Sequence, residues 1–293
     1  MNAGEYKIEV MCNVLGICRS AYYRWVDGGN KSEGKDREDA MIKTEIRRIY
    51  KNSRKTYGRP RMVTALKEKG HKCGKHRVRR LMREEGLIGQ QKKRFKPYTT
   101  DSDHGLAVAP NLLATYGPIT RPDEVWAADI TYIKINNGWV YLAAILDMYS
   151  RKIVGWSMGK EVNASLVVTA LRRALKTRKA PKLHHSDRGS QYASAAYQRE
   201  LKAYGITPSM SRTANPYDNA TMESFFGTLK AEEIRDQTYN SGQEARAAIF
   251  SYIEAFYNTI RIHTSIGGGS PQQFENKFFS EEEKEVILTG TDN

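Results

Sequence analysis

The 293-residue sequence predicts an α/β fold, in which a mixed five-stranded sheet is flanked by helices and preceded by all-α helix-turn-helix segments. Two observations predict this fold. The first 90 residues show an apolar repeat of helical period that is interrupted by turn residues. From Asp123 onward, three strand-like runs are followed by alternating helix-like and strand-like segments, an order typical of a sheet covered on both faces. With 40% apolar residues, the chain can bury a substantial core.

The segment 1–30 is expected to form the first helix-turn-helix. Ile8, Met11 and Leu15 repeat at helical spacing, the pattern breaks at Gly16, and it resumes through the stretch RSAYYRW. Arg19, which lies in the second helix, is a candidate contact for a partner, although a packed helical hairpin would give the same pattern. Residues 26–39 are rich in glycine and charge, and we expect a linker there.

A second, basic helix-turn-helix domain is expected over residues 37–90. A helix over 38–51 leads to a segment in which Pro60 suits a first helical turn and Gly70 a C-terminal cap. The next helix, KHRVRRLMREEG, has apolar residues on one face and basic residues around the other. Its candidate ligand contacts are Lys75, Arg77 and Arg80.

Residues 91–121 lack periodicity and contain several prolines, so they are expected to form a basic extended linker. Such an arm can follow a phosphate backbone. Its candidate contacts are Lys92, Lys93 and Arg94.

The positive charge is concentrated in these N-terminal segments. The net charge is +14, yet residues 41–100 hold 20 Lys and Arg against 4 Asp and Glu, so the rest of the chain is slightly acidic. This distribution indicates a polyanionic partner, and we expect DNA. An RNA partner or a merely solvated basic face would give the same charge.

The sequence shows no signal for membrane insertion or export and no metal-binding cysteine pattern. No apolar stretch approaches 18 residues and the N-terminus has no signal-peptide core, so we expect a cytoplasmic protein without a membrane partner. Cys12, Cys18 and Cys73 are odd in number and lack zinc-site spacing, and we interpret them as buried thiols.

Residues 122–275 are expected to form the α/β core with its C-terminal helices, followed by an acidic, frayed tail over 276–293. The runs VWAADITYIKI, GWVYLAAILDMYS and RKIVGWSM predict an antiparallel meander. A helix capped by Asn163, the strand KLHHSD, a helix over 194–204, the strand ITPSM and a helix over 218–235 follow. Five aromatic residues of the meander are expected in the core: Trp126, Tyr132, Trp139, Tyr141 and Trp156.

Three acidic residues in this core suggest metal chemistry. Asp129 is the only charge in the strand over 125–133, Asp187 ends the fourth strand, and Glu223 lies early on the last predicted helix. A buried strand acid is costly unless a cation neutralises it. If the first and fourth strands are neighbours, the three carboxylates meet, and hard oxygen ligands of this kind suit Mg²⁺ or Mn²⁺. Two such ions can support phosphoryl transfer.

The motifs around these acids resemble a known family. ADITYI, HSDRGSQY, NPYDNATMESFFGTLKAE and YNTIRIHTSIGGGSP, together with 35 residues between Asp187 and Glu223, are similar to the integrase core of bacterial insertion-sequence transposases of family three, the OrfB type. The resemblance spans roughly 120–275, and the block YGRPRMVTALKEKG with KHRVRRLMREEGL is similar to that family's helix-turn-helix segment. It implies a ribonuclease H-like fold and a DDE triad of Asp129, Asp187 and Glu223 as catalytic residues and ligands of two metal ions.

The resemblance also implies contacts to DNA. Lys230 follows Glu223 by two helical turns, where the family has a basic residue that meets DNA ends, although it could be a solvated lysine. Asn219 belongs to the same motif and either starts the helix or contacts DNA. Arg188, in the loop after Asp187, either lies near a phosphate or stabilises the turn.

Other polar residues of the core are assigned structural roles. His184 and His185 are expected to pack beside the site, because the resemblance assigns metal binding to carboxylates. Asp147 is expected to stabilise a turn. Ile262 stands where the family usually has proline, and this departure concerns a local turn only.

The function expected from the sequence is a DNA transposase that cuts the 3′ ends of an element and transfers them to another phosphodiester. The resemblance implies a first attack on the opposite end of the same element, then integration. Expected partners are double-stranded DNA of the terminal inverted repeats and the target, and further copies of the chain on DNA. An upstream OrfA-type partner or fusion is a further candidate. Two alternatives stay open at this stage: a non-catalytic DNA-binding regulator of the element ends, and a nuclease of the same fold acting on RNA–DNA hybrids.

Overall fold

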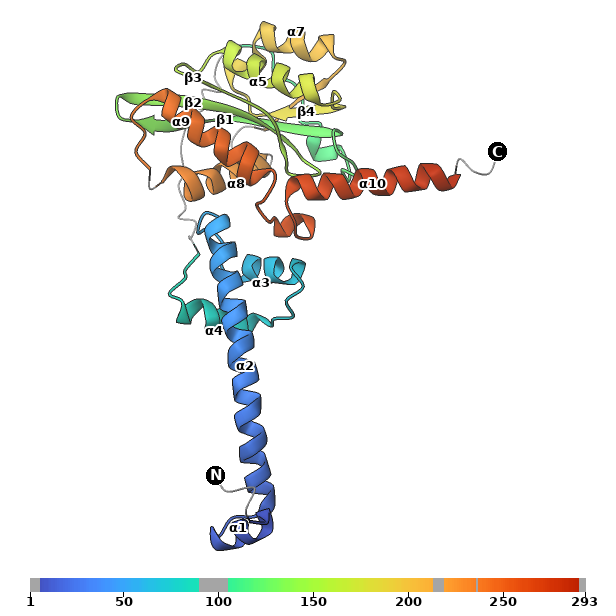
Figure 1. Cartoon of the computed structure of the whole chain (residues 1–293). Coiled ribbons are helices and arrows are strands. Elements are labelled where there is room, and N and C mark those ends of the chain that lie inside the picture. The colour runs from blue at the N-terminus through green and yellow to red at the C-terminus, as the bar shows by residue number, and fades with distance from the viewer. Residues whose placement is uncertain (1–5, 90–104, 213–218, 236, 290–293) are drawn as a thin grey trace. The chain divides into compact units, whose positions relative to one another are not determined.

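The computed structural model describes residues 6–89, 105–212, 219–235 and 237–289, and the chain divides into two compact units, residues 1–89 and 90–293 (Figure 1). None of the helices described in these ranges has an apolar stretch long enough to cross a membrane.

The first unit consists of helices α1 (Ile8–Val14), α2 (Arg19–Asn52), α3 (Arg59–Glu68) and α4 (Lys75–Glu84). Gly58 and Gly74 occupy the N-cap positions of α3 and α4 in extended conformation. The apolar faces of the three longer helices form one core: Ile42, Ile46, Ile49, Met62, Leu66, Val78, Leu81 and Met82. The helix pairs α1/α2 and α3/α4 lie in the segments where the two helix-turn-helix arrangements are expected.

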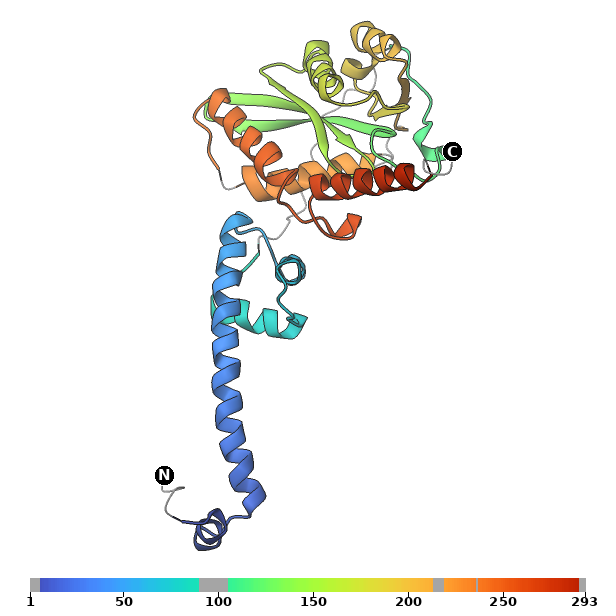
Figure 2. The ribbon, with the colours of Figure 1, turned by 45° about the vertical axis from the view of Figure 1, so that its right-hand side comes forward.

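The predicted linker over 26–39 is wrong, because α2 runs through it without a break (Figure 2). The two glycines at 28 and 29 destabilise a helix by about 1 kcal/mol each relative to alanine, which is too little to end a helix that is stabilised elsewhere. The segment contains no proline, and the buried Ile42, Ile46 and Ile49 anchor the helix further along the chain. The prediction for Cys18 is also wrong, since its side chain is exposed, whereas Cys12 and Cys73 are buried.

The second unit is built on a five-stranded mixed sheet, as predicted. Its strands are β1 (Val125–Ile135), β2 (Gly138–Asp147), β3 (Ile153–Gly159), β4 (Leu183–Ser186) and β5 (Thr207–Met210), in the order β3-β2-β1-β4-β5. The first three strands pair antiparallel, and β4 pairs parallel with both β1 and β5. The first and fourth strands are therefore neighbours, on which the expected meeting of Asp129 and Asp187 depends.

Helices cover both faces of this sheet (Figure 1). Trp126 and Ala128 of β1 pack under α5 (Ala164–Thr177) and α7 (Ala195–Ala203), while Ala127 and Ile133 face the opposite core. The alternation predicted for β1 is thus observed. The opposite face is covered by α8 (Ala220–Leu229), the π-helical η3 (Lys230–Ile234), α9 (Gly242–Phe250) and the π-helical η4 (Ser251–Tyr257). Short helices complete the unit: η1 (Leu113–Thr115), α6 (Ser190–Ala193) and η5 (Thr264–Ile266).

The predicted frayed tail is instead part of a helix, α10 (Pro271–Thr289). Phe274 and Phe278 pack against the ring of Tyr149 at centroid distances of 5.1 and 5.4 Å. Glu275 is almost fully buried and forms ion pairs with Arg178 and Lys152. Because these contacts fix the first two turns to the sheet, the acidic residues that follow continue an established helix.

Two further expectations need correction. Trp139 is 48% exposed, because it lies next to the turn of the β1–β2 hairpin, opposite Lys134, where it makes a T-shaped ring contact with Tyr132. Of the predicted linker 91–121, residues 91–104 lie outside the described residues. The part beyond is not a free arm, because the backbone N–H groups of Leu112 and Leu113 donate to the hydroxyl of Ser209 in β5.

Candidate active site

Asp129 lies in the middle of β1, the central strand of the sheet. Its Oδ1 accepts a hydrogen bond of 2.7 Å from the backbone N–H of Ile130, and its side chain shares the face of Ala127. Burial, followed by the negative charge of Asp187, raises the pKa of Asp129 well above its usual range. The ionised form of Asp129 is therefore destabilised by its buried position and by the neighbouring acid.

Asp187 directly follows β4 and lies level with Asp129. The parallel register pairs Ala127 with His185, so the two aspartates, each two residues further on, project from neighbouring strands on the same face. Neighbouring strands are about 4.8 Å apart, which brings the two carboxylates into direct electrostatic contact. The N–H of Gly189 donates to Asp187 Oδ1 at 3.0 Å, and a Cβ at Gly189 would come within 2.8 Å of Gln191 Oε1 and 3.1 Å of that Asp187 oxygen. A larger residue at position 189 would therefore displace the side chains of Gln191 and Asp187.

Glu223 and Lys230 come from the helix that covers the same face. Helix α8 buries Met222, Phe225 and Phe226 in the core beneath β1, and Glu223 next to them is exposed. The charge of Glu223 adds to the rise in the pKa of Asp129, whereas the charge of Lys230 opposes it. Three acids and one base therefore act on one another at the centre of the sheet.

Lys230 is half-buried at the first residue of the π-helical η3. Burial lowers its pKa, and the charge of Asp129 counteracts this shift. Its Nζ lies 4.6 Å from the ring centroid of Tyr132 on β1, a distance typical of a cation–π contact. The predicted straight helix over 218–235 thus changes its winding at this lysine, as π-helical turns often do near functional sites.

The donor chemistry of the three carboxylates fits a hard divalent cation, because Asp129 and Asp187 repel each other and a cation would relieve this repulsion. Within the described ranges, however, no group of three or more His, Cys, Asp or Glu side chains is close enough together to hold a metal ion. Glu223 is the outlying member, since its side chain is exposed. The predicted ligand set stays a prediction.

The other polar residues near the site have structural contacts. His184 and His185 are buried, with ring nitrogens 2.6 Å from the Tyr197 hydroxyl and 2.9 Å from the Ser209 hydroxyl, respectively. Asp147 is fully buried and accepts hydrogen bonds from the backbone N–H groups of Asp123 and Ser150. These positions agree with the packing and turn roles expected from the sequence.

The remaining predicted DNA contacts of the core differ in their surroundings. Arg188 donates from Nε to the carbonyl of Ser211 at 2.7 Å, so part of its guanidinium group stabilises the loop. Asn219 occupies the N-cap position of α8, yet its side chain makes no capping hydrogen bond.

In the first unit, two of the predicted contacts are internally paired. Arg77 forms ion pairs with Glu38 and Asp39, and Arg80 pairs with Asp39 and Glu84.

Lys75, at the start of α4, is exposed. Arg19, at the start of α2, has a weak exposed pair with Glu9 at 3.5 Å. Lys92, Lys93 and Arg94 lie outside the described residues.

Two anchoring contacts of α8 and η3 were not foreseen. Arg151, in the left-handed conformation at the β2–β3 turn, donates to the hydroxyl of Thr221 at 2.8 Å. Arg261 forms a buried, bidentate pair with Glu232 of η3. The sequence signal for Arg261 was its place in the motif YNTIRIHT, but the motif does not name its partner.

Comparison with known proteins identifies the family. Residues 119–216 and 223–279 match families described as "Integrase core domain", and residues 36–95 match "HTH-like domain". The chain is 43% identical over 271 residues to the "Insertion element IS600 uncharacterized 31 kDa protein" of Shigella sonnei, covering 92% of this chain and 98% of that protein. It is 38% identical over 275 residues to "Transposase InsF for insertion sequence IS3A" of Escherichia coli (strain K12), covering 93% and 95%.

The chain belongs to the IS3 family of transposases. The resemblance inferred from its motifs is confirmed, and with it the ribonuclease H-like integrase-core fold and the N-terminal helix-turn-helix region of an IS3-family chain. Among solved structures, the catalytic core domain of HTLV-2 integrase in complex with magnesium (trimeric form) matches 54% of this chain and 99% of its own at 16% identity, with a TM-score of 0.42. The catalytic core domain of BIV integrase matches 55% and 98% at 21% identity, with a TM-score of 0.41.

Proposed function

We propose that this IS3-family chain cleaves the 3′ ends of its insertion sequence and joins them to another DNA phosphodiester, with Asp129, Asp187 and Glu223 as the catalytic triad. The observation that supports this function is the level placement of Asp129 in β1 and Asp187 directly after the neighbouring parallel strand β4, where burial and then the charge of Asp187 raise the pKa of Asp129. A site for negatively charged phosphodiesters requires compensating cations at such a position.

The three carboxylates would hold two Mg²⁺ or Mn²⁺ ions, which supply activation of the attacking oxygen and stabilisation of the leaving oxygen. Asp129 is held by the strand and by the N–H of Ile130, and Asp187 by the N–H of Gly189. These two therefore form the fixed part of the site, and Glu223 completes it from the helix above.

Lys230 supplies positive charge beside Asp129 and would contact a phosphate of the bound DNA end. In the reaction we propose, water first releases the 3′-hydroxyl of the element. That hydroxyl then attacks a phosphodiester of the opposite end and, in a later round, of target DNA. Arg188 and Asn219, at the loops that flank the acids, are proposed to orient the same DNA.

The first unit is proposed to bind the terminal repeats through α4. Arg77 and Arg80 of this helix are paired with acids of the same unit. In contrast, Lys75, Arg79 and Arg83 are exposed, and no ion pair involves them within the described residues. Their spacing of four residues forms one stripe along the helix. This stripe, more than Arg77 or Arg80, is suited to contact phosphates.

We further propose that at least two copies of the chain assemble on DNA, because two element ends must be held together for joining. An upstream OrfA-type partner is a further candidate. Acting on chromosomal DNA of a bacterial host would make the protein cytoplasmic and nucleoid-associated.

The deciding experiment is strand joining with a labelled element end and Mg²⁺, comparing the parent chain with Asp187→Asn and Glu223→Gln. The expected result is metal-dependent joining by the parent and a loss of about 10³-fold or more in both variants, with DNA binding retained. Joining that persists in both variants would refute the triad. Binding of the ends without cleavage by the parent would favour the regulator instead, and preferential cutting of RNA–DNA hybrids would favour the nuclease.

A further inference from the structure

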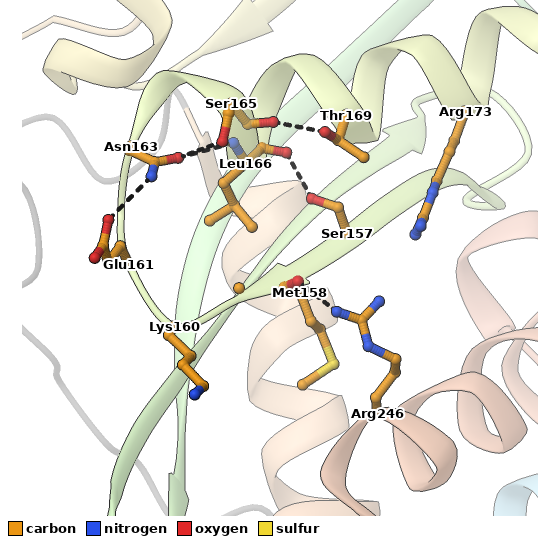
Figure 3. Close-up of a pocket in the computed structure, with 11 residues that line it drawn as sticks. Ser157, Met158, Lys160, Glu161, Asn163, Ser165, Leu166, Thr169, Arg173 and Arg246 are labelled. Atoms are coloured by element: carbon orange, nitrogen blue, oxygen red, sulfur yellow. Dashed lines mark hydrogen bonds between the residues drawn. The ribbon is translucent and has the colours of Figure 1, made fainter. Parts of the chain in front are cut away.

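A pocket of about 240 Å³ lies where β3 ends and α5 begins (Figure 3). It is lined by the last residues of β3, by the loop that leads to Asn163, by one side of α5 and by Arg246 of α9. Neither the candidate triad nor Lys230 contributes to it. It is a separate site on the same unit.

Two arginines are fixed at this pocket by an edge strand. β3 lies at the edge of the sheet, so alternate carbonyl groups of this strand have no neighbouring strand to pair with. Arg173 of α5 donates to the carbonyl of Trp156 at 2.9 Å, and Arg246 donates to the carbonyl of Met158 at 2.6 Å. Each guanidinium group uses one nitrogen in this contact and retains further N–H donors.

The two contacts place both arginines at the same edge of the sheet. Trp156 and Met158 are two residues apart along one strand, so their carbonyl groups are about 6.6 Å apart. Figure 3 shows the two guanidinium groups on opposite sides of β3, with their ends turned toward each other. Two guanidinium groups held on successive outward-facing carbonyls of one strand can approach the oxygens of a single phosphate from two sides.

The charge of the pocket also favours an anion. Lys160, Arg173 and Arg246 supply three positive charges, and the only acid among the lining residues is Glu161. In the described part of the chain, no carboxylate lies within ion-pair distance of Lys160, Arg173 or Arg246. Glu161 instead accepts a hydrogen bond from the side chain of Asn163 at 3.3 Å. Like charges held this closely without an acidic partner are stabilised by a bound anion.

We propose that this pocket binds a backbone phosphodiester of DNA, clamped between Arg173 and Arg246 with Lys160 beside it. This inference rests on the proposed function, which supplies the polyanion. The pocket is large enough for a phosphate group, and its lining is more polar than apolar. A contact of this kind fixes the register of DNA on the protein without reading its sequence.

The sheet register relates this pocket to the candidate active site. Met158 pairs with Leu142, and Leu142 pairs with Thr131, two residues from Asp129. Met158 is therefore two strands across the sheet from β1, about 10 Å from Thr131 and about 12 Å from Asp129. A span of about 12 Å corresponds to about three to four base pairs along the axis of a DNA duplex. The strand that reacts at Asp129, or the strand it attacks, can thus supply the phosphate.

The test is DNA binding by the full chain, measured by fluorescence anisotropy at several salt concentrations with two labelled duplexes of equal length. One duplex carries an element end and the other an unrelated target sequence. The variants are Arg173→Gln with Arg246→Gln, and Lys160→Gln alone, which touches no backbone carbonyl of β3. The matched control is Arg199→Gln with Lys202→Gln, which removes the same charge from the exposed side of α7.

The arginine double variant is expected to weaken binding of at least one duplex by about 10-fold or more. It should also lower the slope of log affinity against log salt by about 1, whereas the control changes neither. Lys160→Gln should give a smaller loss on the same duplex. A loss confined to the element end identifies that DNA as the source of the phosphate, and a loss that includes the unrelated duplex identifies target DNA.

Unchanged affinity and salt slope for both duplexes, in Lys160→Gln and in the double variant, would overturn the inference. If the double variant melts at a lower temperature than the parent, Arg173→Lys with Arg246→Lys replaces it, and retained binding by that variant supports a charge contact. A parent chain that joins element ends while its variants bind normally refutes this inference alone. A parent chain that neither binds nor joins DNA refutes the proposed function as well.

Discussion

Replacing Arg261 by methionine is expected to destabilise the unit that carries the candidate active site by about 3–5 kcal/mol. The side chains of Arg261 and Glu232 are only 4% and 5% exposed, and their two hydrogen bonds measure 2.7 and 2.8 Å. Without the arginine, Glu232 retains the hydroxyl of Tyr252 as a hydrogen-bond donor but has lost its buried counter-charge. A buried carboxylate in this situation accounts for the predicted loss.

The loss is measurable by thermal unfolding of the full chain. For a unit of this size, 1 kcal/mol corresponds to about 2–4 °C, so the transition of this unit should fall by about 6–20 °C. The matched control is Lys277→Met, which breaks the exposed pair with Glu281, where the side chains are 73% and 62% exposed. An exposed pair of this kind contributes about 0–1 kcal/mol, so this variant should melt close to the parent.

The coupling can be tested separately with the double variant Arg261→Met with Glu232→Leu. Since it removes both charges together, it should recover most of the stability lost in Arg261→Met. A melting temperature of Arg261→Met within 2 °C of the parent would refute the reasoning, as would a double variant that loses the sum of both single effects. Because Glu232 lies two residues after Lys230, strand joining should fall together with stability and recover with it.

Three further predictions concern packing, pH and metal. Gly155→Ala should lower the free energy of unfolding by about 1–3 kcal/mol, because its Cβ would lie 2.5 Å from the carbonyl oxygen of Ala170 in α5. Urea unfolding measures this loss, and unchanged stability would mean that α5 can move away from β3 at no cost. Burial, then the charge of His185, lowers the pKa of His184 from 6.5 to about 3. As the pH drops below 6.5, His184 is protonated in the unfolded chain before it is protonated in the folded one. The free energy of unfolding therefore falls by up to about 1.4 kcal/mol per pH unit. A His184→Asn variant should show a shallower acid dependence, and an equal slope in both chains would contradict the assignment. Chelation of divalent ions should abolish strand joining and leave binding of the helix-turn-helix unit to DNA intact, so joining in excess EDTA would exclude a metal-dependent reaction.

The meeting of Asp129 and Asp187 was predictable because it depends on strand periodicity and on one topological rule. A lone acid in the apolar strand β1 and an acid at the end of β4 become neighbours once the crossover from β3 through α5 places β4 parallel to β1. The position of Glu223 depends on how α8 leans on the sheet. That angle follows from side-chain packing of Met222 and Phe225, which no periodicity encodes.

Two of the features that the sequence did not predict depend on contacts between distant residues. Arg151 and Thr221 are 70 residues apart, and Arg261 and Glu232 are joined across two helices. The π-helical turn at Lys230 has no composition signal of its own. The linker expected over 26–39 was wrong for a different reason. The low helix propensity of its glycines is a local effect, and the cooperativity of a long helix outweighs it.

Because α2 is uninterrupted, it fixes how α1 is oriented around the helix axis relative to α3 and α4. A helix of 34 residues is about 51 Å long, and each residue turns it by about 100°. Deleting one residue between Lys35 and the buried Asp39 would therefore rotate α1 and the start of α2 by about 100° around the axis, while α3 and α4 keep their places on the other end. Deleting seven would restore nearly the original orientation about 10 Å closer. The continuous helix α2 therefore fixes the angle and the distance between α1 and the α3/α4 pair. A DNA duplex that contacts both must fit this angle and this distance.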